Sequence, residues 1–195
     1  MALIENGQVI AARHEVVERG HAERLVPMIA ELPGGGRAAH LLVDVGPGSF
    51  TGIRVGIAAA RGLRLGWGAS VAGYSSLALL AAAGFDAADR TAPLATLLEG
   101  GHGEVFMQVF APNPLRPLDE LRSLTPAAAR AELAGLDAVG DGLRWLTSVT
   151  PRTAPRRELP RAADAILLPP ALTGLPPRPL YGRAPDAKLP AAPTA

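Results

Sequence analysis

The chain has no cysteine among its 195 residues, and aromatic residues make up only 4% of it. The lack of cysteine excludes disulfide bonds and thiolate metal ligands. Because aromatic side chains are scarce, a core has to be built from alanine, leucine, valine and isoleucine. The hydrophobic content of 48% is typical of a folded protein rather than a disordered one.

The chain also lacks an excess of either charge. Its 19 basic and 18 acidic residues give a net charge of +1, whereas a dedicated nucleic-acid-binding protein shows a basic excess or a basic stripe. No run approaches the roughly 20 apolar residues of a membrane span, and no basic-then-apolar leader opens the sequence. We therefore expect a cytoplasmic protein that makes no membrane contact and does not bind RNA or DNA strongly on its own.

Residues 1–90 predict a compact α/β lobe. Asn6-Gly7 lies between two strand-like runs, 1–4 and 8–17, and is a strong hairpin signal. Apolar residues then recur with helical spacing over 21–32, which contains Pro27. The elements expected next are a strand at 39–45, a helix at 50–66, a strand at 70–73 and a helix at 75–83.

Residues 91–195 predict a smaller second lobe with a proline-rich tail. Two strand-like runs enclose a glycine-rich turn at 100–103, which indicates another hairpin. Thr125 followed by Pro126 marks the start of a short helix, and 137–143 favours a buried strand and turn. More than half of the 19 prolines lie beyond Thr150, which predicts irregular coil there.

The most distinctive stretch is "GPGSFTGIRVGIAAARGLRLG" at 46–66, after an apolar run. A phosphate-binding loop of the Walker type requires Lys-Ser or Lys-Thr where Ile53-Arg54 stands, and a dinucleotide-binding loop requires glycine at Thr51. A nucleophile elbow requires glycine two residues on either side of Ser49, where Pro47 and Thr51 stand. All three spacings fail, so the glycines do not indicate a phosphate site or a nucleophile.

A structural interpretation of this stretch fits better. Ser49 can cap a helix that starts at Phe50, while Gly46 and Gly48 allow a sharp turn. Within the helix Gly52, Gly56 and Ala60 recur every four residues, with Arg54 and Arg61 opposite. Each interior glycine costs about 1 kcal/mol relative to alanine, so a close neighbour is expected. The helix is apolar nearly all round, which predicts that its own sheet covers one side and another subunit covers the glycine stripe.

No cluster of catalytic or metal-binding residues is evident. His14, His21, His40 and His102 fall in four separate segments without ligand spacing, and each is expected to be a surface or capping residue. Glu99 and Glu104 flank the second hairpin turn, where carboxylates are usually solvated. We therefore expect no catalytic residue, no cofactor and no bound metal.

The 46–66 motif, followed by "GYSSLALLA", resembles the signature of the TsaB family. The segments "ENGQVIAARHE" and "HAERLVPMI" resemble its early hairpin and first helix, "EGGHGEVFMQVF" its second hairpin, and "PLYGRAPDAK" its C-terminal element. The similarity covers nearly the whole chain. It implies an actin-like, ribonuclease-H-like α/β fold of two lobes.

The resemblance also implies a function. TsaB is the non-catalytic dimerisation subunit of a bacterial complex that transfers a threonylcarbamoyl group to tRNA. The acceptor is the adenosine 3′ of the anticodon in tRNAs that read codons beginning with A. The implied partners are TsaD, which is the catalytic paralogue, and the ATPase TsaE, with tRNA reached only through the complex and a homodimer formed in isolation.

The family's interface helices correspond to 21–32 and 50–66 here. The residues expected at the partner interface are His21, Leu25, Met28, Ile29, Leu32, Gly52, Ile53, Gly56, Ile57, Ala60 and Leu63. The residues expected to form the structural motif are Gly46, Pro47, Gly48, Ser49, Phe50, Thr51, Gly52 and Arg54. TsaD carries a His-x-x-x-His metal pair, and alignment on Gly73 places Ser76 and Leu80 at those positions.

The sequence departs from the family pattern in two places. Family members begin with a strand carrying Asp-Thr-Ser or Asp-Thr-Ala, and this first strand of the N-terminal lobe is expected to be missing here. Two explanations are open: a start codon placed too late, which would leave that strand encoded in frame upstream of Met1, or a truncated protein of low stability. In the second hairpin Glu99 replaces an aspartate and Gly101 an arginine.

Two other functions remain open at this point. A metallopeptidase-like hydrolase would need a metal site, and the replaced metal pair argues against it. An actin-like kinase would need an acidic residue on the first strand and a phosphate loop, neither of which is found.

Overall fold

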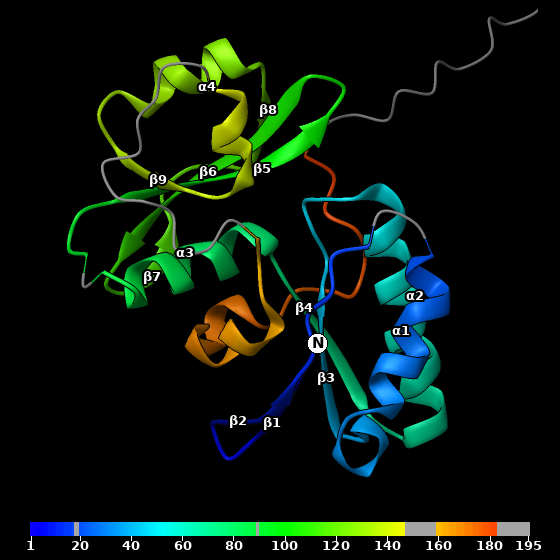
Figure 1. Ribbon diagram of the computed structural model, residues 1–195. Coiled ribbons are helices and arrows are strands. Elements are labelled where there is room, and N and C mark those ends of the chain that lie inside the picture. The colour runs from blue at the N-terminus through cyan, green and yellow to red at the C-terminus, as the bar shows by residue number, and fades with distance from the viewer. Residues whose placement is uncertain (18–19, 89, 147–158, 183–195) are drawn as a thin grey trace, which may run out of the picture.

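The computed structural model describes residues 1–17, 20–88, 90–146 and 159–182. Its first half contains β1 (Ala2–Glu5), β2 (Gln8–Ala12), α1 (His21–Ala30), the 3-10 helix η1 (Pro33–Gly36), β3 (His40–Asp44), α2 (Phe50–Trp67), β4 (Ser70–Tyr74) and α3 (Ser76–Asp86) (Figure 1). The second half contains β5 (Leu94–Gly101), β6 (Glu104–Pro112), β7 (Leu115–Pro117), β8 (Arg122–Leu124), α4 (Pro126–Leu133), β9 (Asp137–Val139) and the 3-10 helices η2 (Asp141–Trp145), η3 (Ala162–Leu167) and η4 (Pro170–Leu172).

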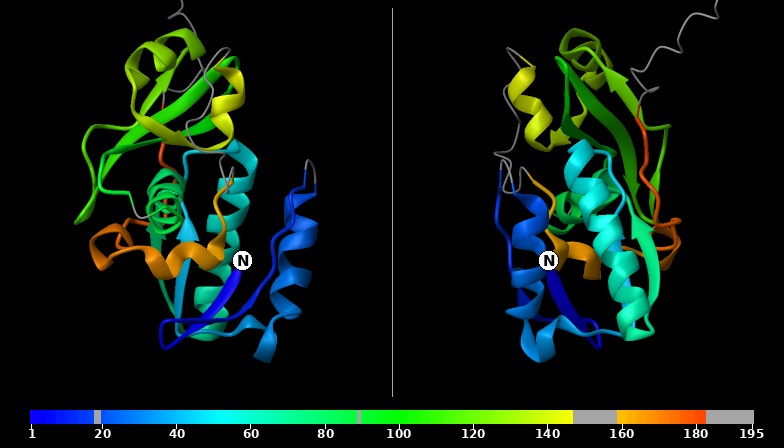
Figure 2. Two further views of the ribbon diagram at one scale, coloured as in Figure 1. Left: turned by 60° about the vertical axis from the view of Figure 1, so that its left-hand side comes forward. Right: turned by 90° about the vertical axis from the view of Figure 1, so that its right-hand side faces the viewer.

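The first half contains two separate two-stranded sheets. β1 and β2 form an antiparallel hairpin whose turn residues Asn6 and Gly7 both have positive φ, as the Asn-Gly signal predicts. β3 and β4 pair in parallel, with Leu42 opposite Ala72. Helices α1 and α2 contact each other and lie on the same side of these strands (Figures 1 and 2).

The second half is built on one five-stranded sheet. Its order is β7-β6-β5-β9, and β8 also pairs with β6. The long β5–β6 hairpin turns at His102 and Gly103, both with positive φ, where the sequence predicts a hairpin. Helix α4 begins after Thr125, whose side chain accepts a hydrogen bond from the N–H of Ala128, as the capping signal predicts.

The apolar core belongs mainly to residues from 74 onward. One cluster joins α3 to one face of the β5–β6 hairpin, and another fills the opposite side of the same sheet beneath α4 and η2. Leu77, Leu80, Leu97 and Phe110 are all at most 1% exposed. The core is mainly aliphatic, as the scarcity of aromatic residues predicts, with Phe106, Phe110 and Tyr74 as its aromatic members.

The C-terminal segment returns to the first half of the chain. Gly73 and Leu175 exchange backbone hydrogen bonds, and the N–H of Leu180 donates to the carbonyl of Val45 at 2.8 Å. Helix η3 contacts β1, β2 and α3. The division of the chain at residue 90 remains a prediction, and this segment from beyond residue 90 packs against residues from before it.

Several element boundaries differ from those predicted. β2 ends at Ala12 rather than at 17, because Arg13 and Glu15 turn toward α1. Part of the tail predicted as coil forms η3 and η4, whereas residues 173–182 form no helix or strand apart from an isolated bridge at Leu175, as predicted. Residues 147–158 and 183–195 lie outside the described residues. Strands β7 and β8 were not predicted, because three residues are too few to reveal a period-two pattern.

Candidate partner interface and the cavity beneath it

The glycine motif forms the turn that leads from β3 into α2. Gly46 has a φ of +103°, and a Cβ there would lie 2.8 Å from Cδ1 of Ile53, so this position requires glycine. The Ser49 hydroxyl accepts a hydrogen bond from the N–H of Gly52 at 3.2 Å and caps α2. The predicted turn and cap are thus confirmed, although Gly48 needs no positive φ.

Asp44 connects this turn to the start of α3. Its Oδ1 accepts hydrogen bonds from the N–H of Gly46 at 2.8 Å and from the Ser76 hydroxyl at 2.6 Å. Burial raises the pKa of the Asp44 carboxyl from 3.8 to about 6, although both hydrogen bonds act to lower it. Burial raises the pKa of the Tyr74 phenol, and the negative charge of Asp44 raises it further. Sequence reasoning missed Asp44, whose only signal is a lone carboxylate within an apolar strand.

Arg54 fixes the C-terminal segment beside the glycine motif. Its Nη2 donates to the Tyr181 hydroxyl at 2.8 Å, and its Cζ lies 3.2 Å from the centroid of the Phe50 ring. On the same side of α2, Arg61 donates to the carbonyl of Pro177 at 2.8 Å. The motif's arginine therefore has a structural role, and it links two widely separated segments that carry the family resemblance.

A cavity of about 1350 Å³ lies beneath α1 and α2. It is bordered by residues of β1, including Ala2 and Ile4, and by residues of β3, including Leu42. Side chains from α1, α2 and η3 also line it. Leu42 is 40% exposed, which is unusual for an apolar residue in the middle of a strand.

The predicted interface residues face this cavity rather than an outer surface. Nine of them line it, namely His21, Leu25, Ile29, Leu32, Gly52, Ile53, Gly56, Ala60 and Leu63. Met28 and Ile57 are buried within the chain. A Cβ added at Gly56 would lie 3.8 Å from Cγ2 of Val43 on β3. The glycine stripe of α2 therefore lies toward β3 of its own lobe, and the partner interface predicted for these residues stays a prediction.

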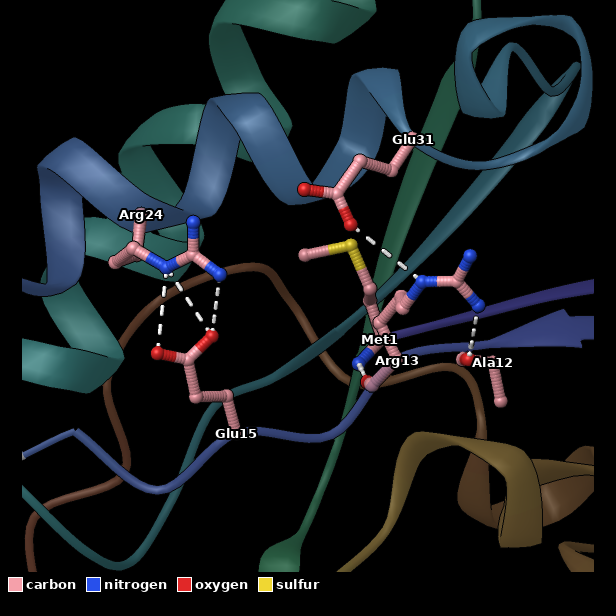
Figure 3. A network of polar contacts seen from close by, with 6 residues as sticks. All are labelled: Met1, Ala12, Arg13, Glu15, Arg24 and Glu31. Atoms are coloured by element: carbon pink, nitrogen blue, oxygen red, sulfur yellow. Dashed lines mark hydrogen bonds and ion pairs between the residues drawn. The ribbon is translucent and has the colours of Figure 1, made fainter.

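Polar contacts hold the first hairpin beside α1 (Figure 3). Arg24 on α1 donates through Nη2 to Glu15 at 2.5 Å, and Arg13 forms an ion pair with Glu31 at 3.5 Å. The ammonium group of Met1 donates to the carbonyl of Arg13 at 2.6 Å, and burial lowers the pKa of that ammonium group. These contacts position Met1, which also lines the cavity.

The positions aligned with the metal pair of TsaD have structural roles here. Ser76 donates to Asp44, and Leu80 is buried in the apolar core. Glu99 pairs with Arg144, and Glu104 accepts a hydrogen bond from Ser123 at 2.6 Å, so neither carboxylate is simply solvated as predicted. Within the described ranges, no three His, Asp or Glu side chains are close enough together to hold a metal ion.

The predicted absence of histidine clustering agrees with the structure. His14 and His102 are exposed, and His40 forms a hydrogen bond with Ser70 at 2.7 Å. His21 starts α1 and lies against Gly52. None of the helices in the described part of the chain has both the length and the apolar character needed to cross a membrane.

The comparisons with known proteins agree with this architecture. The family model of TsaD, described as tRNA N6-adenosine threonylcarbamoyltransferase, matches residues 8–112, which is more than half of the chain. The chain belongs to the TsaD family. Its resemblance to TsaB is confirmed by the tRNA threonylcarbamoyladenosine biosynthesis protein TsaB of Escherichia coli K12, 32% identical over 108 residues. That protein's counterpart in Haemophilus influenzae is 38% identical over 78 residues.

The matched region is only part of these TsaB relatives. It covers 52% of this chain and 46% of the E. coli protein, and 37% of this chain and 33% of the H. influenzae protein. The chain thus spans less than half the length of the curated relatives it matches.

Solved structures resemble more of the chain. YeaZ from Pseudomonas aeruginosa is 25% identical, with a TM-score of 0.71 over 85% of this chain and 82% of that one. A second crystal structure, described as similar to peptidase YEAZ from Pseudomonas aeruginosa, is 26% identical, with a TM-score of 0.74 over 93% of each chain. The mixed α/β architecture and these neighbours are consistent with the actin-like, ribonuclease-H-like class.

Proposed function

We propose that the chain is a non-catalytic subunit in tRNA threonylcarbamoyladenosine biosynthesis and that it binds TsaD through the outer face of α1 and α2. The observation that carries the proposal is an exposed stripe of small and apolar residues on α2. It comprises the exposed Thr51, Ala58, Gly62 and Leu65 together with the half-buried Val55, and these residues recur at helical spacing. The TsaB relatives, named for this biosynthesis, support the same role.

The exposure of this stripe favours a protein partner. The side chain of Leu65 is 85% exposed, and on the neighbouring helix Val26 is 60% exposed. A Cβ added at Gly62 would meet no atom within 4 Å, so another helix can approach closely there. Apolar side chains that are exposed together on two adjacent helices are typical of a docking surface. The proposal keeps α1 and α2 as the interface helices. It places the contact with TsaD on their outer faces rather than on the glycine stripe of α2.

The structural roles of Ser76 and Leu80 support a subunit that contributes no metal to the reaction. A hydroxyl engaged by Asp44 and a buried leucine occupy the positions that align with the metal pair. Threonylcarbamoyl transfer would then take place on TsaD. The same proposal includes three further interactions. These are contact with TsaE, contact with tRNA through the complex, and pairing of two copies of the chain in isolation.

Calorimetric titration of the full chain with the TsaD of the same genome tests the proposal. Gly62→Leu adds a side chain to the outer face of α2 and is expected to weaken the affinity by about tenfold or more, which corresponds to about 1.4 kcal/mol. Gly56→Leu makes the same change on the inner face and serves as the matched control, with an affinity expected within about twofold of wild type. Equal affinities for the two variants, or no binding by the wild-type chain, would contradict the proposal.

A further inference from the structure

Two segments that pack together carry arginine but no acidic residue. Residues 45–85, which contain α2, have no aspartate or glutamate, and neither do residues 165–182. The first stretch carries Arg54, Arg61 and Arg64, and the second carries Arg178. Because the chain as a whole has a net charge of only +1, the positive charge of these two segments is a local concentration.

The fold brings these arginines together along one side of α2. Arg54 and Arg61 are seven residues apart, which is two helical turns and about 10 Å along the helix axis. Arg64 is a neighbour of Arg61 on the helix surface because the two are three residues apart.

The segment 177–181 completes this side of the molecule. It runs beside α2 (Figures 1 and 2), and Arg54 and Arg61 each donate a hydrogen bond to it at 2.8 Å. Arg178 lies within this segment and is exposed. We call the surface formed by Arg54, Arg61, Arg64 and Arg178 the arginine strip.

Within the described ranges, no carboxylate neutralises the arginine strip. The ion pairs found there involve other arginines, namely Arg13, Arg24, Arg90, Arg122 and Arg144. Arg61 and Arg64, like Arg178, are exposed to solvent. A guanidinium group binds phosphate oxygens through two parallel hydrogen bonds, and it does so most strongly where no carboxylate competes. The arginine strip therefore favours a ligand that carries several phosphate groups.

Two exposed aromatic rings lie at the Arg54 end of the strip. Phe50 is 68% exposed and Tyr181 is 60% exposed, in a chain in which aromatic residues make up only 4%. The guanidinium carbon of Arg54 lies 3.2 Å from the centroid of the Phe50 ring and 5.4 Å from that of the Tyr181 ring. Unpaired nucleobases stack on aromatic rings and on guanidinium planes. Rings and cations together favour a single-stranded nucleic acid over an acidic peptide.

We infer that the arginine strip, together with Phe50 and Tyr181, binds a single-stranded segment of RNA. The strip contacts phosphate groups, and an unpaired base stacks on the exposed Phe50 ring. The choice of RNA rests on the proposed function, in which the chain meets tRNA within a complex. Leu65, in the stripe assigned to TsaD, lies one helical turn after Arg61, so RNA and TsaD occupy neighbouring surfaces. The isolated chain binds RNA only weakly, because four cations make few phosphate contacts.

Fluorescence anisotropy tests this inference on the full chain without TsaD. The probe is a labelled single strand of about ten uridines. At roughly 50 mM salt a Kd of about 10–100 μM is expected, and log K should fall with log salt at a slope of about −2 to −3, since each phosphate contact contributes about −0.7. Equal binding of a poly-glutamate peptide or of an RNA duplex of the same length would overturn the inference, and so would a lack of saturable binding.

Charge variants locate the bound RNA. Arg178→Gln is expected to weaken RNA binding by about threefold and to reduce the salt slope by about 0.7. The double variant Arg61→Gln, Arg178→Gln should weaken it by about tenfold. Arg116→Gln removes an exposed arginine from β7 and is the matched control, with a Kd expected within about twofold of wild type. Circular dichroism checks that the variants are folded. Equal losses for Arg178→Gln and Arg116→Gln would overturn the assigned surface.

An aromatic variant tests the stacking contact separately. Phe50→Ala removes an exposed ring and no charge, so it is expected to weaken RNA binding by about fivefold or more and to leave the salt slope unchanged. Unchanged affinity would show that the rings do not contact the RNA.

Titration with TsaD separates this inference from the proposed function. Arg178→Gln is expected to bind TsaD with an affinity within about twofold of wild type, because the stripe assigned to TsaD is unchanged. RNA binding by a wild-type chain that does not bind TsaD would contradict the proposed function alone. Full RNA binding by the double variant, with TsaD binding retained, would contradict this inference alone.

Discussion

The two halves of the molecule differ in how completely their sheets are formed. In the second half, β5 and β6 have strand partners on both edges over part of their length, and Leu97 and Phe110 lie in continuous apolar clusters. In the first half two strand pairs border a cavity of about 1350 Å³, and Leu42 is 40% exposed. Because buried apolar area and paired backbone groups both stabilise a fold, we expect the second half to contribute more to the stability of the chain than the first half.

Removal of a core side chain should show the largest difference between the halves. Leu97→Ala leaves a cavity in a fully buried cluster and is expected to cost about 2–5 kcal/mol of unfolding free energy. Leu42→Ala, the matched change on the exposed β3, is expected to cost less than about 1 kcal/mol because less apolar area is lost. Chemical denaturation measures both. Similar losses would mean that the first half is as well packed as the second.

Asp44 should make the first half sensitive to pH. Its folded pKa of about 6 lies above the unfolded value of 3.8, so its contribution to stability is fully present below pH 3.8 and is lost as the pH rises through about 6. That difference corresponds to at most about 3 kcal/mol. Asp44→Asn keeps an oxygen that can accept from Gly46 but does not ionise. Between pH 4 and pH 7 the wild-type chain should lose more stability than the variant, and parallel denaturation curves would contradict this.

A smaller effect is expected where the C-terminal segment is attached. Tyr181→Phe removes the hydroxyl that accepts a hydrogen bond from Arg54 and should lower the free energy of unfolding by about 0.5–1.5 kcal/mol. Because the ring remains, its contact with the arginine is retained. Thermal unfolding measures this change in the free energy of unfolding. A larger decrease would mean that the C-terminal segment stabilises the first half by more than this hydrogen bond accounts for.

The smallest expected effect is a gain. Gly62→Leu replaces a poor helix former in open space, so α2 should become more stable by up to about 1 kcal/mol. Thermal unfolding of the isolated chain measures this. A lower melting temperature would show that the outer face of α2 already packs against another part of the molecule.

Local signals in the sequence predicted much of the fold. The Asn6-Gly7 turn, the Ser49 cap and the Thr125 cap depend on neighbouring residues alone, and all three are found. The orientation of α2 could not be derived in this way. Its apolar residues extend nearly all round the helix, so sequence spacing does not distinguish the cavity side, with Gly56, from the outer side.

Contacts between distant residues were equally inaccessible. The hydrogen bond of Arg54 to Tyr181 and that of Asp44 to Ser76 depend on how the chain returns on itself, which no local pattern encodes. The cavity is a property of two strand edges and three helical segments together. The family resemblance therefore led to the prediction that α1 and α2 form the partner interface, which stays a prediction, but it could not determine which of their faces is exposed.

Hydrogen–deuterium exchange of the full chain, alone and with TsaD, tests the proposed function most directly. We predict slower exchange in the presence of TsaD over α1 and α2, with the largest change near Ala58 and Leu65, and unchanged exchange in the β5–β6 hairpin. Protection confined to the β5–β6 hairpin, or no protection at a TsaD concentration that saturates other subunits of its complex, would contradict the account.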